Sequence, residues 1–165
     1  MIIREATDVD WRDIYPFFRS IVDAGATYAY PAGLSSNEAR ELWMESPPGL
    51  TVVAENEDRI VASAKMGPNR PGRGAHVATA SFMVDPDQQG LGAGRALGEY
   101  MVQWARDEGY HAIQFNAVVE SNTAAVHLWQ SLGFAILATV PEAFDHSALG
   151  LVGLHVMYLP LRQSE

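Results

Sequence analysis

The stretch from Asp85 to Gly98 reads DPDQQGLGAGRALG and places three glycines at alternate positions between an apolar run and a stretch with helical periodicity. Glycine has no Cβ, so a ligand can come close to its backbone amide. The first N–H groups of a helix have no partner within the helix and attract anions. This spacing therefore predicts a loop that binds phosphate groups.

Two common phosphate-binding loops do not fit these residues. GxxxxGK[ST] needs a lysine, and the only lysine in the chain is Lys65. The dinucleotide pattern GxGxxG fails because Arg95 or Leu97 stands where its last glycine belongs. An amide, Gln114, stands near the position about 20 residues on where an acidic residue should bind ribose. The pattern that fits is Q/R-x-x-G-x-G/A, carried by Gln89–Gly94.

A second motif follows further along the chain. NTAAVHLWQSLGF, from Asn122 to Phe134, is similar to N-x-x-A-x-x-L-Y-x-x-x-G-F. This motif, the glycine hexapeptide and the order of strands and helices resemble the GNAT family of acetyltransferases over nearly the whole chain. The resemblance implies acetyl-CoA as co-substrate, no metal, and N-acetyltransferase activity. Alone, the hexapeptide would also suit a strand-to-helix connection that binds nothing.

The resemblance also assigns residues to acetyl-CoA. The loop amides would bind the pyrophosphate, with added charge from Arg95, and the end of the preceding strand would pair its backbone with the pantetheine arm. N–H groups near Met83 and Val84 would polarise the thioester carbonyl. Core packing is the alternative for that strand. The expected acetyl-CoA-binding residues are Phe82, Met83, Val84, Gln89, Gly90, Leu91, Gly92, Ala93, Gly94, Arg95, Asn122, Ala125 and Trp129.

Trp129 departs from the family pattern. Relatives usually have a tyrosine there, thought to protonate the leaving thiolate, whereas an indole N–H donates without ionising usefully. We therefore expect Trp129 to form a core or pocket wall. FNAVVESN, LWQSLGF and TYAYP are similar to fungal acetyltransferases that detoxify proline analogues such as azetidine-2-carboxylate, and to their bacterial relatives. That likeness makes Asn116 and Asn122 the candidate catalytic residues, at the transfer site and on CoA; capping of loop backbone is the alternative for Asn116.

The group that accepts the amine proton is not identified by any motif. Attack on a thioester needs a neutral amine, so some group must take its proton. The candidates are His76, Glu120 and a water molecule held by Asn116.

The acceptor pocket is expected to combine aromatic and polar side chains from several loops. Tyrosines in a loop supply a rigid wall with a polar tip, and Arg70, Arg73 or a backbone nest would suit an acceptor carboxylate. Residues 141–153 are expected to form a late loop over this pocket. The predicted pocket residues are Tyr28, Tyr30, Trp43, Asn69 and His76.

Hydrophobic periodicity indicates which elements position these residues. It predicts strands at residues 2–5, 51–56, 59–66, 76–84, 111–119, 134–140 and 154–161, with Glu57 and Asp58 turning a hairpin. Helices are expected from about residue 7 to Gly25, either beginning late or kinking at Pro16, and over 35–45, 96–109 and 121–133. We expect one α/β (α+β) domain over 1–165: a mostly antiparallel mixed sheet of six to seven strands with helices on both faces. The resemblance adds a splayed parallel strand pair.

Composition limits the partners. The net charge is −9, from 20 acidic and 11 basic residues, with no basic stripe, so we expect neither a nucleic-acid nor a membrane partner. The absence of cysteine excludes disulfides, thiolate metal sites and a cysteine nucleophile. No apolar signal core precedes the domain, so a cytoplasmic location is expected. Of the possible assemblies, the one we expect is a homodimer. We expect transfer to a small-molecule amine, possible alternatives being a non-catalytic acyl-CoA-binding module or an enzyme acting on polyamines or protein N-termini.

Overall fold

The computed structural model describes residues 1–161. One seven-stranded sheet has the order β1-β2-β3-β4-β5-β7-β6, and all neighbouring strands are antiparallel except β4 and β5. The strands are β1 (Ile2–Glu5), β2 (Leu50–Asn56), β3 (Arg59–Pro68), β4 (Val77–Val84), β5 (Ala112–Val119), β6 (Ala135–His146) and β7 (Gly150–Pro160). The α-helices are α1 (Trp11–Ala24), α2 (Ser36–Trp43), α3 (Ala93–Asp107) and α4 (Thr123–Ser131).

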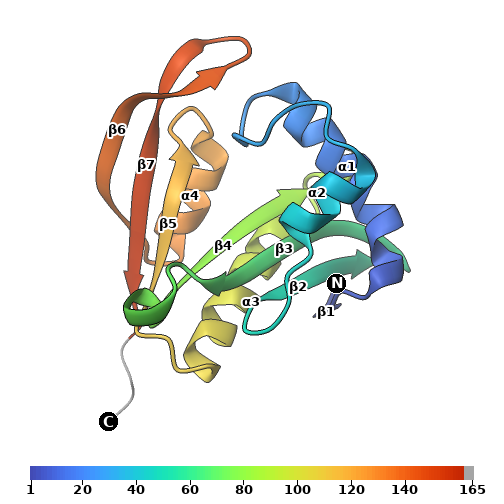
Figure 1. Ribbon diagram of the computed structural model, residues 1–165, viewed down its shortest axis with the longest axis horizontal. Coiled ribbons are helices and arrows are strands. Elements are labelled where there is room, and N and C mark those ends of the chain that lie inside the picture. The colour runs from blue at the N-terminus through green and yellow to red at the C-terminus, as the bar shows by residue number, and fades with distance from the viewer. Residues whose placement is uncertain (162–165) are drawn as a thin grey trace.

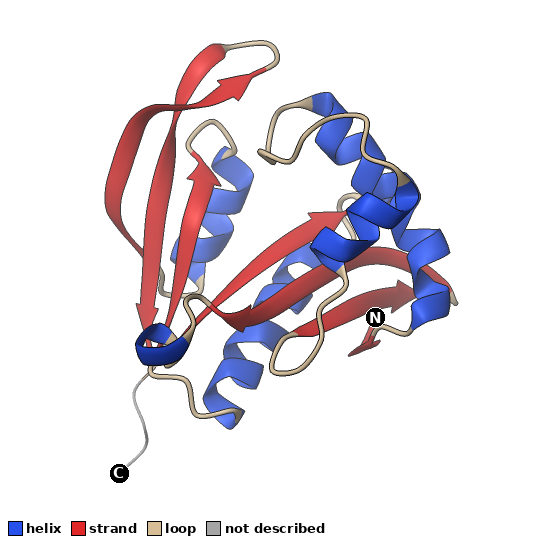
Figure 2. Ribbon diagram, in the orientation of Figure 1, coloured by secondary structure: helices blue, strands red, loops and turns tan. Residues whose placement is uncertain are grey.

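The helices lie on both faces of the sheet (Figures 1 and 2). Successive side chains of a strand point to opposite faces, so Val53 of β2 packs with α1 and α2 while its neighbours Val52 and Ala54 pack with α3 and α4. The protein therefore has two apolar cores, one on each side of the sheet. No helix within residues 1–161 is long and apolar enough to cross a membrane.

Local sequence accounts for several of these elements. Glu57 and Asp58 both have positive φ, 50° and 61°, which the tight turn between β2 and β3 requires at both central positions. Ser35 accepts from the Glu38 N–H and Glu38 accepts from the Ser35 N–H, which caps the start of α2. Helix α1 continues through Pro16.

The expected fold class is confirmed: a mixed, mostly antiparallel sheet with one parallel pair and helices on both faces. The expected loop at 141–153 is wrong. These residues extend β6 and β7 into a long hairpin. The register shifts between Val140 and Phe144, and Glu142 there has a φ of 53°. A bulge on an edge strand accommodates Pro141, whose residue type suggested a loop.

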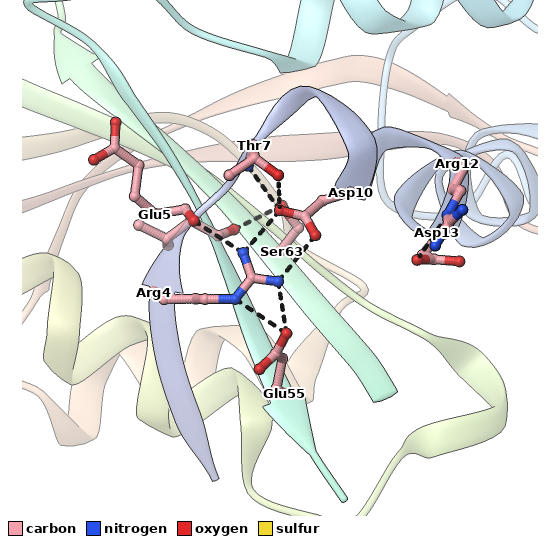
Figure 3. Close-up of polar contacts among 9 residues, drawn as sticks. Arg4, Glu5, Thr7, Asp10, Arg12, Asp13, Glu55 and Ser63 are labelled. Carbon is pink, nitrogen blue, oxygen red and sulfur yellow. Dashed lines mark hydrogen bonds and ion pairs between the residues drawn. The ribbon is translucent and has the colours of Figure 1, made fainter. Parts of the chain in front are cut away.

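A partly buried ion-pair cluster fixes the start of α1 to the edge of the sheet (Figure 3). Arg4 of β1 donates to both carboxylate oxygens of Asp10, at 2.8 and 2.9 Å, and to Glu55 of β2 at 2.6 Å. Asp10 also accepts from the Thr7 N–H at 2.7 Å. These bonds set where α1 begins, and α1 leads directly into the loop that carries Tyr28.

Candidate active site

A cavity passes through the sheet between β4 and β5. The two strands pair only at residues 77–78 and 112–113 and then diverge (Figure 1). The divergence holds a cavity of about 700 Å³. Its lining includes Trp129 of α4 on one face of the sheet and Tyr28, from the loop between α1 and α2, on the other. This slot can therefore be reached from both sides of the sheet.

Hydrogen bonding at the two ends of β4 shows which of its residues face β3. Asp85 donates to the Val61 carbonyl at 2.9 Å, and Asn69 donates to the Val77 carbonyl at 2.8 Å. The register between these points has no shift. Hydrogen-bonded and non-hydrogen-bonded pairs alternate along antiparallel strands, so the odd-numbered residues of 77–85 direct their backbone groups toward β3.

The even-numbered residues of β4 direct theirs toward the slot. Beyond the short pairing with β5, these are Ala80, Phe82 and Val84. The expectation that the Met83 N–H faces the ligand is therefore wrong, because Met83 belongs to the set paired with β3. An extended ligand in the slot would meet the backbone groups of Val84, whereas both backbone groups of Phe82 already bond to the Tyr28 hydroxyl.

The glycine loop leads from β4 into α3. Gly90 and Gly92 have φ values of 83° and 78°, which other residues adopt only with strain. A Cβ built at either glycine would meet no atom within 4 Å, so a ligand has room to approach the backbone. Helix α3 starts at Ala93, and its first helical hydrogen bond runs from the Ala96 N–H to the Gly92 carbonyl. The amides of residues 93–95 precede this first helical bond and form an anion-binding helix start.

The side chains of the loop divide between the slot and the surface. Gln89 and Gly94 line the cavity, Ala93 is buried and Leu91 is exposed. Arg95 is half exposed and donates to the Ser131 hydroxyl at 2.8 Å. Its positive charge thus lies beside the helix start rather than deep in the slot.

Helix α4 forms the wall of the slot on the α3 side. Asn122 caps the helix by accepting from the Ala125 N–H at 3.4 Å, and both residues line the cavity. Trp129 is buried, with its ring centroid 4.6 Å from that of Phe82 and 4.9 Å from that of Phe115. It therefore packs between the two diverging strands, the wall position expected from its residue type.

A chain of amides follows the other face of β5. Gln114 donates to the Asn116 side-chain oxygen at 3.0 Å, and Asn116 donates to that of Asn69 at 2.6 Å. The register of β5 against β7 shifts between Phe115 and Val118, so Asn116 lies in a bulge, which changes the direction of a side chain. Asn116 lines the cavity on the face that carries α1 and α2.

The loop between α1 and α2 covers this same face. Tyr28 and Tyr30 both line the cavity, and their rings stack at a centroid distance of 5.6 Å and an angle of 6°. The Tyr28 hydroxyl accepts from the Phe82 N–H at 2.8 Å and donates to the Phe82 carbonyl at 2.6 Å. An aromatic wall therefore touches the slot-facing backbone of β4.

The sequence model of the Acetyltransferase (GNAT) family matches residues 11–134. The chain belongs to this family. The match includes β4, the glycine loop and α4, the elements that line the slot. The GNAT assignment agrees with the resemblance drawn from the hexapeptide at Gln89–Gly94 and the motif at Asn122–Phe134.

Two solved structures agree with this fold, and a curated relative is similar in sequence. The structure of a GCN5-related N-acetyltransferase from Kribbella flavida is 58% identical, with a TM-score of 0.94 and 97% of each chain covered. The structure of yncA from Salmonella typhimurium, solved with its cofactor acetyl-CoA, is 26% identical, with a TM-score of 0.83, and the match covers 100% of this chain and 96% of that one. The L-amino acid N-acyltransferase MnaT of Escherichia coli is 36% identical over 107 residues, 62% of each protein.

Some residues predicted for the GNAT pocket lie elsewhere. Trp43 is fully buried in the core and donates to Ser63 at 2.9 Å. His76 precedes β4 and lies beside His111, at the closed end of the strand pair, and does not line the slot. Glu120 accepts from the Gly153 N–H at 2.6 Å. None of these three side chains reaches the slot, so neither His76 nor Glu120 is retained as a candidate base.

Sequence reasoning did not place Lys65 in the site. Lys65 of β3 lines the slot and also a second cavity of about 480 Å³ that adjoins it, which Arg70 lines as well. Its ammonium group donates to the Leu42 carbonyl at 2.6 Å and lies 3.4 Å from a Glu45 carboxylate oxygen. The sequence does carry a signal, since Lys65 is the only lysine of this acidic chain and stands within a mostly apolar strand.

Proposed function

We propose that this GNAT protein transfers the acetyl group of acetyl-CoA to the amine of a small molecule, by direct attack within a ternary complex. The observation that carries the proposal is the cavity through the sheet. It joins the glycine loop, at Gln89 and Gly94, to the polar and aromatic face formed by Asn116 and Tyr28. Acetyl-CoA would enter from the α3 and α4 side and the amine from the α1 and α2 side, so both fit at once. Further support is the acetyl-CoA held by the yncA relative.

The reaction needs few groups from the protein. The amine nitrogen forms a bond to the carbonyl carbon, the C–S bond breaks, and its electron pair leaves with sulfur. The described residues that line the slot include no Asp, Glu or His. We infer that the amine proton passes to water held near Asn116, whose side chain already belongs to an amide chain with Gln114 and Asn69.

We infer further that the acceptor is an amino or imino acid. Lys65 and Arg70 line the cavity that adjoins the slot, and a carboxylate there would form charge-assisted hydrogen bonds. The name of the MnaT relative also points to amino acids. The similarity of FNAVVESN, with Asn116 and Asn122, to enzymes of proline analogues makes azetidine-2-carboxylate a specific acceptor to test.

The acceptor is tested by measuring CoA release from acetyl-CoA with panels of amino acids, imino acids, polyamines and peptides. We expect turnover with the first two panels. Lys65→Met should lower kcat/KM for the active acid about 10- to 100-fold, as the loss of a charged hydrogen bond does, and leave the matching decarboxylated amine unaffected. Turnover confined to polyamines or peptides would refute the acceptor class, and acetyl-CoA binding without turnover on any amine would indicate a binding module.

The acetyl-CoA site is tested separately with a pair of glycine variants. Gly92→Asp places a carboxylate where the pyrophosphate would lie and should abolish acetyl-CoA binding in calorimetry. Gly109→Asp is the matched control, because Gly109 follows the other end of α3 with a φ of 80° and equally open space. Backbone strain is therefore similar in both variants. Unchanged affinity in Gly92→Asp, or equal loss in both, would contradict the assignment of the loop.

A further inference from the structure

The Tyr28 hydroxyl occupies the middle of the slot-facing edge of β4. It accepts the Phe82 N–H at 2.8 Å and donates to the Phe82 carbonyl at 2.6 Å. A neighbouring strand would bond to these same two groups. The Tyr28 phenol thus takes the place of a strand partner at Phe82. An extended ligand that pairs with Val84 would end at this phenol.

The ring of Tyr28 is held in place on two sides. It stacks on Tyr30, which stacks in turn on Phe18 of α1 at a centroid distance of 5.7 Å. Its other neighbour is Trp43, which meets it at 82° with centroids 6.3 Å apart and is itself fully buried. The phenol is therefore fixed by packing as well as by its two hydrogen bonds.

The loop that carries Tyr28 is also anchored at its ends. Ser147, in the turn between β6 and β7, donates its N–H to the Gly25 carbonyl at 2.9 Å and its hydroxyl to the Ala24 carbonyl at 2.6 Å. At the other end, the Tyr15 hydroxyl donates to the Leu34 carbonyl at 3.0 Å. Moving Tyr28 out of the slot would break its own two bonds and disturb this packing.

The Phe82 amide has a single hydrogen, and Tyr28 already accepts it. A thioester carbonyl that reaches this point meets the phenol oxygen first. The hydroxyl hydrogen can rotate from the Phe82 carbonyl toward such an oxygen. The hydrogen bond that Tyr28 accepts from the Phe82 N–H would strengthen the hydrogen bond that the Tyr28 hydroxyl donates. Burial raises the pKa of Tyr28 above its usual range, so the hydroxyl remains a donor at neutral pH.

We propose that Tyr28 is a catalytic residue whose hydroxyl donates a hydrogen bond to the thioester carbonyl oxygen of bound acetyl-CoA while accepting the Phe82 N–H. As the amine forms its C–N bond, the carbonyl π electrons move onto oxygen, where this hydrogen bond stabilises them. They return as the C–S bond breaks and its electron pair leaves with sulfur. Tyr28 keeps its proton throughout, and the amine proton passes to water. This role rests on the proposed function and differs from that of the family tyrosine at position 129, because Tyr28 stabilises the carbonyl oxygen and does not protonate the thiolate.

Tyr28→Phe tests the inference because it removes the hydroxyl and keeps the stacked ring. Loss of one donor to a developing oxyanion typically lowers kcat 100- to 1,000-fold, so we expect kcat to fall about 100-fold or more. Affinity for acetyl-CoA in calorimetry should change less than about threefold. Tyr110→Phe is the control, since it removes a phenol whose ring packs on Trp104 and does not line the slot, and it should leave kcat unchanged.

A spectroscopic readout separates this role from a structural one. In wild type, the carbonyl stretch of bound acetyl-CoA labelled with carbon-13 should lie at lower frequency than in Tyr28→Phe. If Tyr28 instead leaves when acetyl-CoA binds, Tyr28→Phe will bind acetyl-CoA more tightly and retain kcat, which overturns the inference alone. Failure of wild type to bind acetyl-CoA would overturn the proposed function.

Discussion

Replacing Asp10 with asparagine removes the charge at the centre of the cluster that fixes the start of α1. Asp10 is buried and accepts four hydrogen bonds, two from Arg4 and two from Thr7. The bonds from Arg4 contribute most to holding the pKa of Asp10 at about 2, below its ordinary 3.8. Asparagine keeps the shape of the side chain but cannot accept both guanidinium bonds as a carboxylate does.

This pKa gives both the size and the sign of the effect. A difference of almost two pKa units between the folded and unfolded states corresponds to about 2.5 kcal/mol of stability. Because the folded-state pKa is depressed, this stability is fully present above about pH 4. It is lost as the pH falls from there through about 2. Asp10→Asn should therefore unfold more easily than wild type at pH 7, and the gap should narrow as the pH falls below 4.

Urea unfolding at pH 7, 5, 4 and 3 measures this gap. With a urea m-value of about 2 kcal/mol/M, the midpoint of Asp10→Asn should lie about 1 M below that of wild type at pH 7. Asp13→Asn is the control, since Asp13 is half exposed and its nearest Arg12 nitrogen is 3.6 Å away (Figure 3). Its effect should stay under about 1 kcal/mol. Equal midpoints for wild type and Asp10→Asn at pH 7, or a gap that persists unchanged at pH 3, would refute the reasoning.

Two further predictions concern the α4 wall of the slot. Trp129→Phe should retain most of the turnover, because Trp129 packs between Phe82 and Phe115; a loss of about a hundredfold in kcat with unchanged Tm would instead assign it a chemical role. Gly98→Ala would place a Cβ 2.9 Å from the ends of both Leu132 and Trp129. The close contact should push the indole into the slot, so acetyl-CoA affinity should fall. Calorimetry that shows full affinity would contradict this.

Features encoded by neighbouring residues could be predicted from the sequence. The turn at Glu57 and Asp58 depends on backbone preferences within a few residues and occurs where expected. Helix α3 instead begins at Ala93, three residues before the expected start at Ala96, because Gly92 already ends the loop in a left-handed conformation. The mixed sheet followed from the order of such elements, and the family from two motifs. The branch within the family and the roles of Asn116 and Asn122 stay predictions.

Features made by distant residues could not be predicted. Tyr28 and Phe82 are 54 positions apart, and no pattern in TYAYP distinguishes a phenol that bonds to a strand from one that covers a helix end. The direction of the Met83 backbone groups could not be predicted either, because it depends on the register of β4 with β3. His76 was a reasonable base by residue type, yet the strand order places it at the closed end of the slot.

The alternation of side chains along β4 has a consequence for how such proteins diverge. Met83 packs into the core with α1 and α2, whereas Phe82 and Val84 pack on the side of α3 and α4. If acetyl-CoA and the amine approach from these opposite sides, neighbouring residues of one strand are constrained by different ligands during evolution. A descendant protein can then change its acceptor through alternate residues of β4 and the Tyr28 loop while inheriting the acetyl-CoA side intact.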